Sequence, residues 1–368
     1  MHIPDGYLSP STCAVGFAVA APFWYTASRQ VSKVVKTKNV PYLALMAALS
    51  FIIMMFNIPI PDGTTAHAVG GALIAIVLGP WAAVIAVSVA LAFQALLFGD
   101  GGVLAYGANV VNMAVILPFV GIAVYRLVAG RAALTSRRRV VAAAIAGYVG
   151  LNAAALATAI EFGIQPDLFH TANGTPLYSP YDLSQSIPAM MFAHLTVAGF
   201  CEAALCAGVL AYLQRADVTR LVPNHPGVPL SAEDQPAKSG SVLTPARAAV
   251  GFMVAMVVLT PIGLLAPGGA WGEDAPADLD LHELGLSAVP SGLAKYNDFW
   301  GHTLLGDYGF SSGAHANLAY ILSAVVGILV VGAVIFVIGT VVRRLTADAP
   351  DHETAGDPAD EVNRTRAR

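Results

Sequence analysis

The chain carries little charge. Asp, Glu, Lys and Arg make up 11% of its 368 residues, whereas about 25% is usual for a soluble protein. Hydrophobic residues make up 56%, in runs long enough to cross a bilayer as helices. This balance excludes the ordinary soluble classes. It predicts an all-α integral membrane protein of about nine transmembrane helices (seven plus two).

Several common motifs are also absent. No phosphate-binding loop of the Gly-x-x-x-x-Gly-Lys-Ser/Thr type occurs, so the chain is not expected to hydrolyse ATP by that route. Residues 1–10 lack a basic region and a cleavage pattern, so we expect no signal peptide. The basic residues are dispersed, which argues against nucleic-acid binding. The three cysteines, interpreted as small core residues, are Cys13, Cys201 and Cys206.

Long apolar stretches alternate with polar segments along the chain. The break at 57–63, before the third stretch, is rich in proline and glycine. Spans three and four are short, so they are either two full spans or one broken, re-entrant element. The predicted spans are residues 11–28, 40–57, 67–79, 81–98, 106–125, 140–161, 188–212, 247–266 and 318–342.

The basic residues orient these spans. With the N-terminus outside and the C-terminus inside, the inner segments hold 18 of the 19 Lys and Arg residues, and only Lys295 lies outside. Positive charge is enriched in cytoplasmic loops. The count therefore favours this orientation and argues for keeping spans three and four separate.

The first two residues form a chelator. The α-amine of Met1, the backbone nitrogen of His2 and its ring nitrogen can close two fused rings of about five and six members on one metal ion. Such nitrogen sets suit square-planar or tetragonal Ni(II), Cu(II) or Co(II). A Met-His start on its own is more often an incidental histidine on a disordered terminus, so the rest of the chain has to support it.

A fourth nitrogen donor is expected from His67, which follows the Pro/Gly break on the same outer side. Asp5 and Asp62 lie near these ligands in the sequence. They are interpreted either as carboxylates that orient the imidazoles or as caps of turns, and both interpretations stay open.

Six polar residues fall inside predicted spans, where polar groups are costly and usually face the bundle interior. Gln94 and Asn152 are interpreted as hydrogen bonds that hold the bundle together. The other four either line the metal site or make such bonds, which contribute roughly 0.6 kcal/mol each. They are Asn109, Asn112, His194 and Glu202.

At these residues the chain resembles the substrate-capture membrane subunit of cobalt and nickel energy-coupling-factor (ECF) transporters, the CbiM/NikM family. The matching motifs are Met-His-Ile-Pro-Asp-Gly-Tyr-Leu-Ser-Pro at 1–10, Gly-Thr-Thr-Ala-His-Ala-Val-Gly-Gly at 63–71, Gly-Asp-Gly-Gly-Val-Leu-Ala-Tyr-Gly-Ala-Asn-Val-Val-Asn-Met at 99–113 and His-x-x-x-x-Gly-x-x-Glu at 194–202. The resemblance implies that Met1, His2 and His67 hold the metal.

The C-terminal part resembles the family's small accessory subunit (CbiN/NikN, PDGLE-type), fused to the capture subunit. Leu-Leu-Gly-Asp-Tyr-Gly-Phe at 304–310 is similar to its loop, whereas the PDGLE signature is degraded to Pro-Ala-Asp-Leu-Asp at 276–280. We expect a metal-capture domain at 1–215, a cytoplasmic linker at 216–245, a two-helix accessory domain at 246–342 with an outer loop at 267–317, and a disordered tail at 343–368.

The resemblance also implies a function. Such a subunit of the plasma membrane captures Co²⁺ or Ni²⁺ as transported substrate, without an organic cofactor, for cobalamin or nickel-enzyme synthesis. It is not an enzyme, and it works with a transmembrane coupling subunit and two cytoplasmic ATPase subunits. The alternatives are a membrane-embedded metalloenzyme, which needs an open coordination position, and a secondary transporter, which predicts an inverted repeat. The sequence does not distinguish cobalt from nickel.

Overall fold

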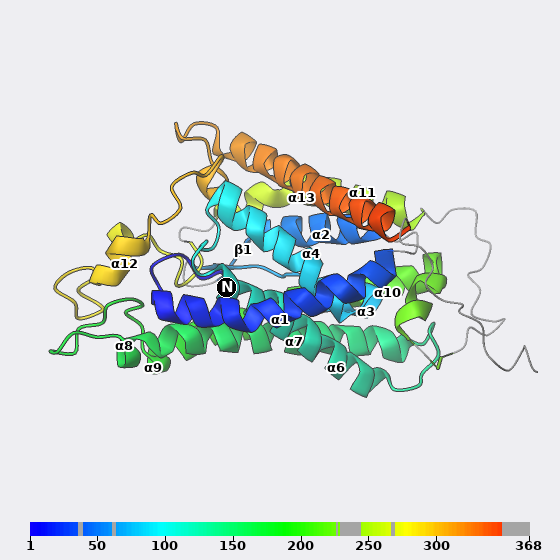
Figure 1. The fold of residues 1–368 in the computed structure, drawn as a ribbon, viewed down its shortest axis with the longest axis horizontal. Helices are drawn as coiled ribbons and strands as arrows, with labels where there is room; N and C mark the ends of the chain where they lie inside the picture. The colour runs from blue at the N-terminus through cyan, green and yellow to red at the C-terminus, as the bar shows by residue number, and fades with distance from the viewer. Residues whose placement is uncertain (36–39, 61–63, 226, 229–243, 266–268, 348–368) are drawn as a thin grey trace, which may run out of the picture.

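The computed structural model describes residues 1–35, 40–60, 64–225, 227–228, 244–265 and 269–347. The chain is mostly helical, as predicted, and its helices lie side by side in one bundle (Figure 1). Within the described residues, six helical segments are long and apolar enough to cross a membrane. They are Pro80–Phe98, Tyr106–Ala129, Arg137–Leu168, Leu183–Ala216, Arg247–Leu265 and Ala316–Val341.

The first half of the chain builds the body of the bundle. Helix α1 (Pro10–Val35) extends beyond the predicted first span, whereas α2 (Val40–Met55) closely matches the second. Two-residue strands β1 (Ile58–Pro59) and β2 (Thr65–Ala66) pair antiparallel after α2. The helices that follow are α3 (Gly71–Leu78), α4 (Pro80–Phe93), α5 (Tyr106–Asn109), α6 (Leu117–Ala129), α7 (Arg137–Gly163), α8 (Gln165–Leu168), α9 (Leu183–Ala193) and α10 (Gly199–Ala216).

The third predicted span is not a full helix. Helix α3 has eight residues, which is about 12 Å of helix against a hydrocarbon core of about 30 Å. The non-helical stretch 65–70 precedes it and is long enough to add roughly 20 Å. Gly70 joins the two with a left-handed backbone (φ 77°), a conformation that glycine adopts without strain. Irregular backbone at this depth is tolerated where it is buried in protein, and residues 65–70 are buried.

Three long helices contain π-helical turns: η1 (Gln94–Phe98), η2 (Val110–Ile116) and η3 (His194–Ala198). Such turns occur often at functional sites. Here η1 leads into the loop of Asp100, η2 carries Asn112, and η3 begins at His194.

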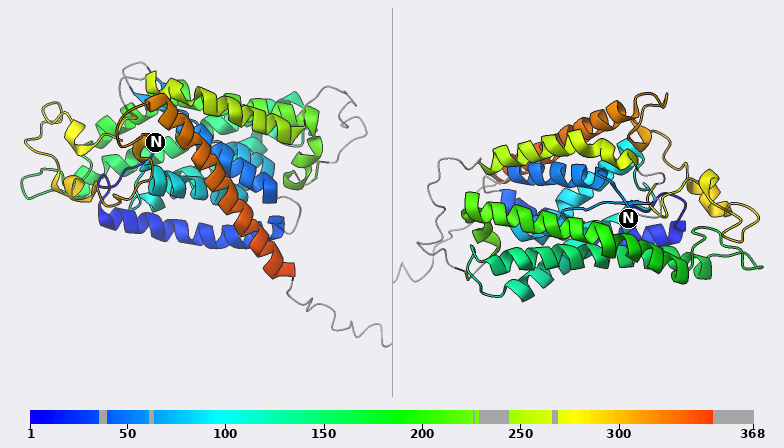
Figure 2. Two further views of the ribbon diagram at one scale, coloured as in Figure 1. Left: turned by 90° about the horizontal axis from the view of Figure 1, so that it is seen from above. Right: turned by 180° about the vertical axis from the view of Figure 1, so that it is seen from behind.

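The second half adds two long helices to one side of the bundle. Helix α11 (Pro245–Leu259) continues into a 3₁₀ segment, η6 (Thr260–Leu265), and α13 (Ala316–Ala347) crosses the bundle obliquely (Figure 2). Helix α13 packs closely on α2, because a Cβ atom at Gly327 would lie 1.9 Å from the Phe51 ring. Between them lie η7 (Pro276–Asp278), α12 (Ser291–Tyr296) and η8 (Gly306–Tyr308).

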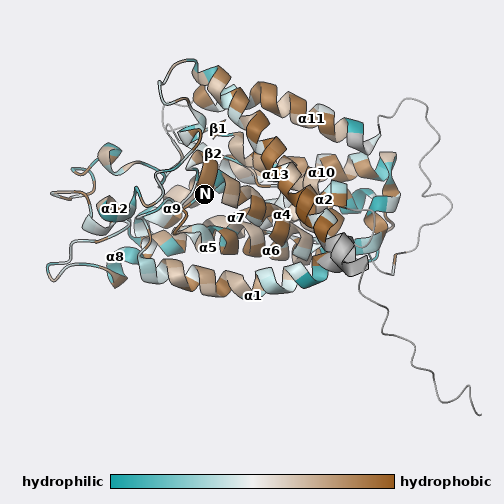
Figure 3. Cartoon of the chain, turned by 45° about the horizontal axis from the view of Figure 1, so that its top comes forward, coloured by the Kyte–Doolittle hydropathy of each residue, from teal (hydrophilic) through white to brown (hydrophobic). Residues whose placement is uncertain are grey.

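Hydropathy follows this architecture. Apolar residues dominate the middle of the bundle, and hydrophilic residues gather at its two ends and in the loops (Figure 3). The segment with α12, the loop around α8 and the N-terminal arm (residues 1–9) lie at the same end (Figure 1). This end holds the candidate site.

Candidate metal centre

The N-terminal arm is threaded into the bundle. Met1 is 2% exposed and His2 1%. The Ile3 N–H donates to Asn109 Oδ1 at 2.8 Å, and Asn109 Nδ2 donates back to the Ile3 carbonyl at 3.0 Å. The Gly102 N–H also donates to that carbonyl, at 2.8 Å. Asn109, predicted as a lining residue, therefore fixes the arm beside His2.

Asp5 holds a loop and does not orient an imidazole. Its carboxylate accepts hydrogen bonds at 2.8–3.1 Å from three successive backbone N–H groups, at residues 103–105, just before α5. Only glycine fits beside it, because a Cβ atom at Gly102 would lie 2.0 Å from Asp5 Oδ1. The turn-cap interpretation is therefore the better one for Asp5, and the imidazole-orienting interpretation is wrong. Asp62 lies outside the described residues.

Three nitrogen atoms of the arm each lie beside a carboxylate oxygen. The Met1 amine donates to Glu273 Oε1 at 2.9 Å, and the His2 backbone N–H donates to the same oxygen at 3.0 Å. Nδ1 of His2 lies 2.8 Å from Asp100 Oδ1, without the alignment of a hydrogen bond. One ligand atom each from His2, Asp100 and Glu273 lie within 4.8 Å of one another, a spacing that suits one metal ion.

Asp100 is fixed on its other side. Gln94 Nε2 donates to Asp100 Oδ2 at 3.0 Å, and the Tyr308 hydroxyl donates to the same oxygen. Burial on its own would raise the pKa of Asp100, but the adjacent His2 ring and the Tyr308 hydroxyl outweigh it, so this pKa is lowered. The carboxylate stays charged with Oδ1 turned to His2. Gln94, predicted as a bundle residue, belongs to this cluster.

His67 presents one free nitrogen at the cluster. Its ring stacks on that of His2, with the centroids 4.9 Å apart. Nδ1 lies 3.0 Å from the Ala68 carbonyl and carries the proton, which leaves the buried Nε2 as a lone pair without a hydrogen-bond partner. A neutral imidazole of this kind is the form that binds a metal ion.

Glu202 supports the segment that carries His67. Its fully buried carboxylate accepts hydrogen bonds at 2.8 Å from the backbone N–H groups of Val69 and Gly70, immediately before α3. The negative charge at the start of a helix is favourable. Glu202 therefore contacts the backbone that directly follows His67.

The three remaining predicted residues make their hydrogen bonds away from the N-terminal arm. Asn112 donates to Thr158 and Glu161 on α7, at 3.1 and 2.7 Å, which is a hydrogen bond between helices. Nδ1 of His194 lies 2.7 Å from the Met190 carbonyl in the preceding turn, and its buried Nε2 has no hydrogen-bond partner. Asn152 donates to a carbonyl of its own helix and not, as predicted, between helices.

The loop between α11 and α13, which the sequence predicts to lie outside, covers the arm. The Tyr7 hydroxyl donates to the Asp274 carbonyl at 2.8 Å, and Thr65 forms a parallel bridge with Ala270. The Trp271 ring packs against Tyr181, with the centroids 4.6 Å apart. These contacts explain how Glu273, remote in sequence from Met1, reaches the amine. Neither Glu273 nor Asp100 was predicted as a site residue from the sequence, although Asp100 stands inside one of the quoted motifs.

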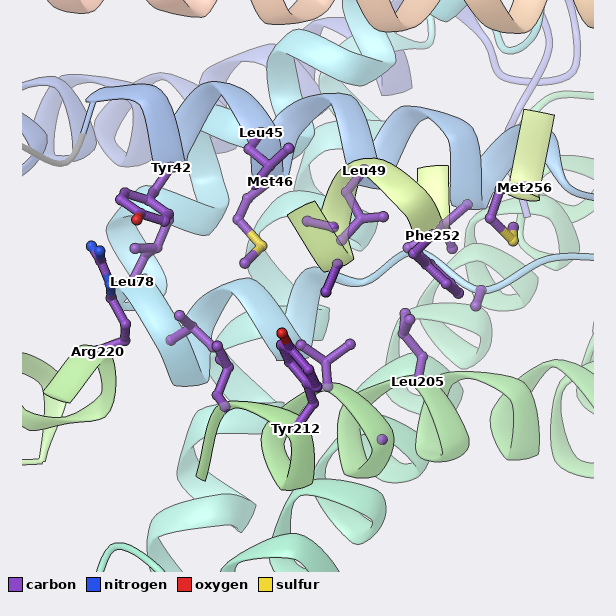
Figure 4. Close-up of a pocket in the computed structure, with 18 of the residues that line it drawn as sticks. Tyr42, Leu45, Met46, Leu49, Leu78, Leu205, Tyr212, Arg220, Phe252 and Met256 are labelled. Atoms are coloured by element: carbon purple, nitrogen blue, oxygen red, sulfur yellow. The ribbon is translucent and has the colours of Figure 1, made fainter. Parts of the chain in front are cut away.

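A separate cavity of about 990 Å³ lies between α2, α10 and α11 (Figure 4). Its lining includes Tyr42, Leu49, Leu205, Phe252 and Met256, and neither His2 nor His67 contributes to it. Its largely apolar lining offers few donor atoms for a small cation. The candidate metal centre is therefore the compact cluster at the N-terminus and not this cavity.

The chain is a bundle of helices long enough to cross a membrane, and it buries nitrogen and carboxylate donors at one end. This combination is typical of a membrane protein that handles metal cations. Known proteins with similar sequences belong to the same class. Residues 2–219 match the family model of the cobalt uptake substrate-specific transmembrane region, and residues 246–344 match the PDGLE domain. The chain belongs to the cobalt uptake (CbiM) family, with a PDGLE domain joined to it. It is a component of a transition-metal uptake transporter, multi-pass in the plasma membrane.

Relatives resemble the chain over most of its length. The fused nickel transport protein NikMN of Rhodobacter capsulatus is 47% identical over 346 residues, covering 90% of this chain and 95% of that protein. The probable fused nickel transport protein LarMN of Lactiplantibacillus plantarum is 43% identical, with the same coverage. The crystal structure of a transition metal transporter is 60% identical, with a TM-score of 0.55 and coverage of 59% of this chain and 94% of the other.

Proposed function

We propose that four nitrogens hold the transported metal: the Met1 amine, the His2 backbone nitrogen, His2 Nδ1 and His67 Nε2. The observation that carries this proposal is that the amine and the amide N–H both point at one atom, Glu273 Oε1, at 2.9 and 3.0 Å. A cation in that position would meet both nitrogens at once. The stacked ring of His67, with its free Nε2, supplies the fourth donor.

Nickel is the proposed cargo. Both fused relatives that match 90% of this chain are named as nickel transport proteins, whereas the cobalt transport protein CbiM of Geobacter sulfurreducens matches 58% of it. Four nitrogens in a plane also suit Ni(II), which binds such sites more tightly than Co(II). A square-planar set leaves only weak axial positions for a substrate, which favours transport over metalloenzyme chemistry.

The proposal includes partners and orientation. The N-terminus faces outside in a nine-span topology, in which residues 65–70 together with α3 form the third span. Residues 1–215 capture the metal, and residues 246–342, with their outer loop, act as the accessory domain. A coupling subunit and two ATPase subunits of an ECF complex drive delivery into the cell, since ATP hydrolysis needs a phosphate-binding loop that this chain lacks.

The test removes one nitrogen donor at a time. His67→Ala in the purified full-length chain is expected to lower Ni²⁺ affinity by more than the 10–100-fold that loss of a supporting residue costs. It should also shift the visible band of square-planar Ni(II). His282→Ala is the matched control, because His282 is an exposed imidazole on the outer loop. Titration calorimetry measures both, and wild-type binding by His67→Ala would refute the four-nitrogen site.

The role of the amine is tested separately. N-terminal sequencing or mass analysis of the chain purified from cells identifies the mature first residue. Acetylation of the Met1 amine should remove the square-planar band. If the band persisted after complete acetylation, the amine would not be a ligand.

A further inference from the structure

The residues of the candidate metal centre form an exposed layer and a buried layer. The side chains of Asp100 and Glu273 are 15% and 21% exposed, whereas the side chain of His2 is 1% exposed and that of Met1 0%. A hydrated cation arriving from solvent therefore meets two carboxylates before it meets any nitrogen. Carboxylate oxygens suit hard, hydrated divalent cations, and they release them more readily than a nitrogen chelate does.

The two carboxylates converge on the nitrogens that lie behind them. Glu273 Oε1 accepts from the Met1 amine and the His2 amide, and Asp100 Oδ1 faces His2 Nδ1. Both ring nitrogens of His2 are buried, and neither has a hydrogen-bond partner among the residues that the structure describes. An acidic pair alone would not make a site, but a buried, unpartnered imidazole aimed into it supplies a third donor.

We propose that Asp100, Glu273 and His2 form a docking site that first takes up the divalent cation and then passes it to the nitrogen chelate. This inference rests on the proposed function. During transfer the two metal–carboxylate bonds and one metal–water bond are replaced by bonds to the amine, the amide and His67 Nε2, while the bond to the His2 ring is kept. One proton of the amine and the proton of the amide leave to water. The metal keeps its charge throughout.

The two halves of the chain contribute unequally to this docking site. Asp100 and His2 belong to the capture half. Glu273 belongs to the second half, as does Tyr308, which holds Asp100 in place through its hydroxyl. The outer loop of the second half thereby acts in metal entry, as a loading element that supplies one ligand and positions another.

The docking site is expected to affect how fast Ni²⁺ reaches the nitrogen chelate, and not how tightly the chelate holds it at equilibrium. Glu273→Gln in the full-length chain should slow the appearance of the square-planar Ni(II) band at least tenfold in stopped-flow mixing. The Ni²⁺ dissociation constant should change less than about threefold, because the nitrogens remain. Glu283→Gln is the control, since it removes the same charge from an exposed position of the same loop.

Mn²⁺ probes the docking site alone, because it prefers oxygen ligands and does not suit a square-planar nitrogen set. Binding followed by electron paramagnetic resonance should weaken at least tenfold in Glu273→Gln and in Asp100→Asn. It should stay unchanged in His67→Ala and in Glu283→Gln. Asp298→Asn, at an exposed loop position, is the control for Asp100→Asn.

The outcomes distinguish the two proposals. Wild-type rates and wild-type Mn²⁺ binding in Glu273→Gln would overturn the docking site and leave the chelate untouched. A normal Ni(II) band in His67→Ala would overturn the chelate, whatever Mn²⁺ does. Thermal melts and size-exclusion profiles that match wild type establish that each variant is folded. If Glu273→Gln did not fold, Glu273→Asp, with its carboxylate one methylene shorter, would be expected to slow the band to a smaller extent, and an unchanged rate would refute the proposal.

Discussion

Replacing Glu202 is expected to loosen the segment that carries His67. The carboxylate is fully buried, and the backbone N–H groups of Val69 and Gly70 donate to it at 2.8 Å. Glu202→Leu keeps a similar volume but leaves both donors without an acceptor. Glu202→Gln keeps one oxygen, so the two substitutions form a graded series.

The magnitude follows from these two hydrogen bonds. A buried donor left unsatisfied costs about 1–3 kcal/mol, so Glu202→Leu is expected to destabilise the protein by roughly 2–6 kcal/mol. For Glu202→Gln we expect about 2 kcal/mol, because a charge-assisted bond is roughly twice as strong as a neutral one. The loosened His67 segment has to be ordered again when Ni²⁺ binds. If that ordering costs about 2 kcal/mol, Ni²⁺ affinity falls roughly 30-fold.

The assay combines thermal melts with calorimetric Ni²⁺ titration of the full-length chain. Glu161→Gln is the control, since Glu161 accepts from Asn112 on another face of the bundle. It should lower the melting temperature while leaving Ni²⁺ affinity unchanged. A folded Glu202→Leu protein with wild-type Ni²⁺ affinity would refute the argument that Glu202 positions His67.

Four further outcomes are expected. The amine, the amide and the imidazoles have to shed their protons before they can bind Ni²⁺. Calorimetry should then show Ni²⁺ affinity falling by about tenfold per pH unit for each proton released, and a flat profile from pH 8 to 6 would contradict the all-nitrogen site. Asp5→Asn, which weakens bonds to three N–H groups, should lower the melting temperature by several degrees; an unchanged melt would argue against this clamp. Gly102→Ala has no room for its methyl group beside Asp5, so hydrogen exchange of the arm should rise, and unchanged protection would count against that packing. For the proposed topology, a membrane-impermeant thiol reagent applied to intact cells should label Ser312→Cys but not Ala133→Cys, and the reverse pattern would overturn the orientation.

Much of the fold follows from hydropathy, because a membrane helix has to be apolar along its whole length. The span predicted at 106–125 begins at the same residue as the observed segment Tyr106–Ala129. Hydropathy does not register changes of backbone geometry within an apolar run. The π-helical turns were therefore not predicted. The third span was expected to be short, but its helix begins only at Gly71, after Gly70, a residue type at which a helix can give way to irregular backbone.

The residues of the candidate site were likewise only partly predicted from the sequence. Met1 and His2 were predicted because adjacent residues form one chelate by local geometry, and His67 was predicted through a motif. Asp100 and Glu273 were missed because their pairing depends on how the outer loop docks, which no local pattern records. An acidic residue in a loop is ordinarily surrounded by water. Asp100 and Glu273 instead lie against the buried N-terminal arm, and only the folded structure shows this.

The docking of the outer loop gives the fusion a physical role. Glu273 and Tyr308 come from the second half of the chain, and both contact residues of the first half within the metal cluster. The cluster is therefore complete only when the two halves are docked. On separate chains, docking would depend on the concentrations of both partners. Covalent linkage makes it intramolecular, so that docking depends on an effective concentration and no longer on that of a second chain. With the proposed docking site, a single chain would present carboxylates and nitrogens to each arriving ion in a fixed ratio, independent of how much of either half the cell produces.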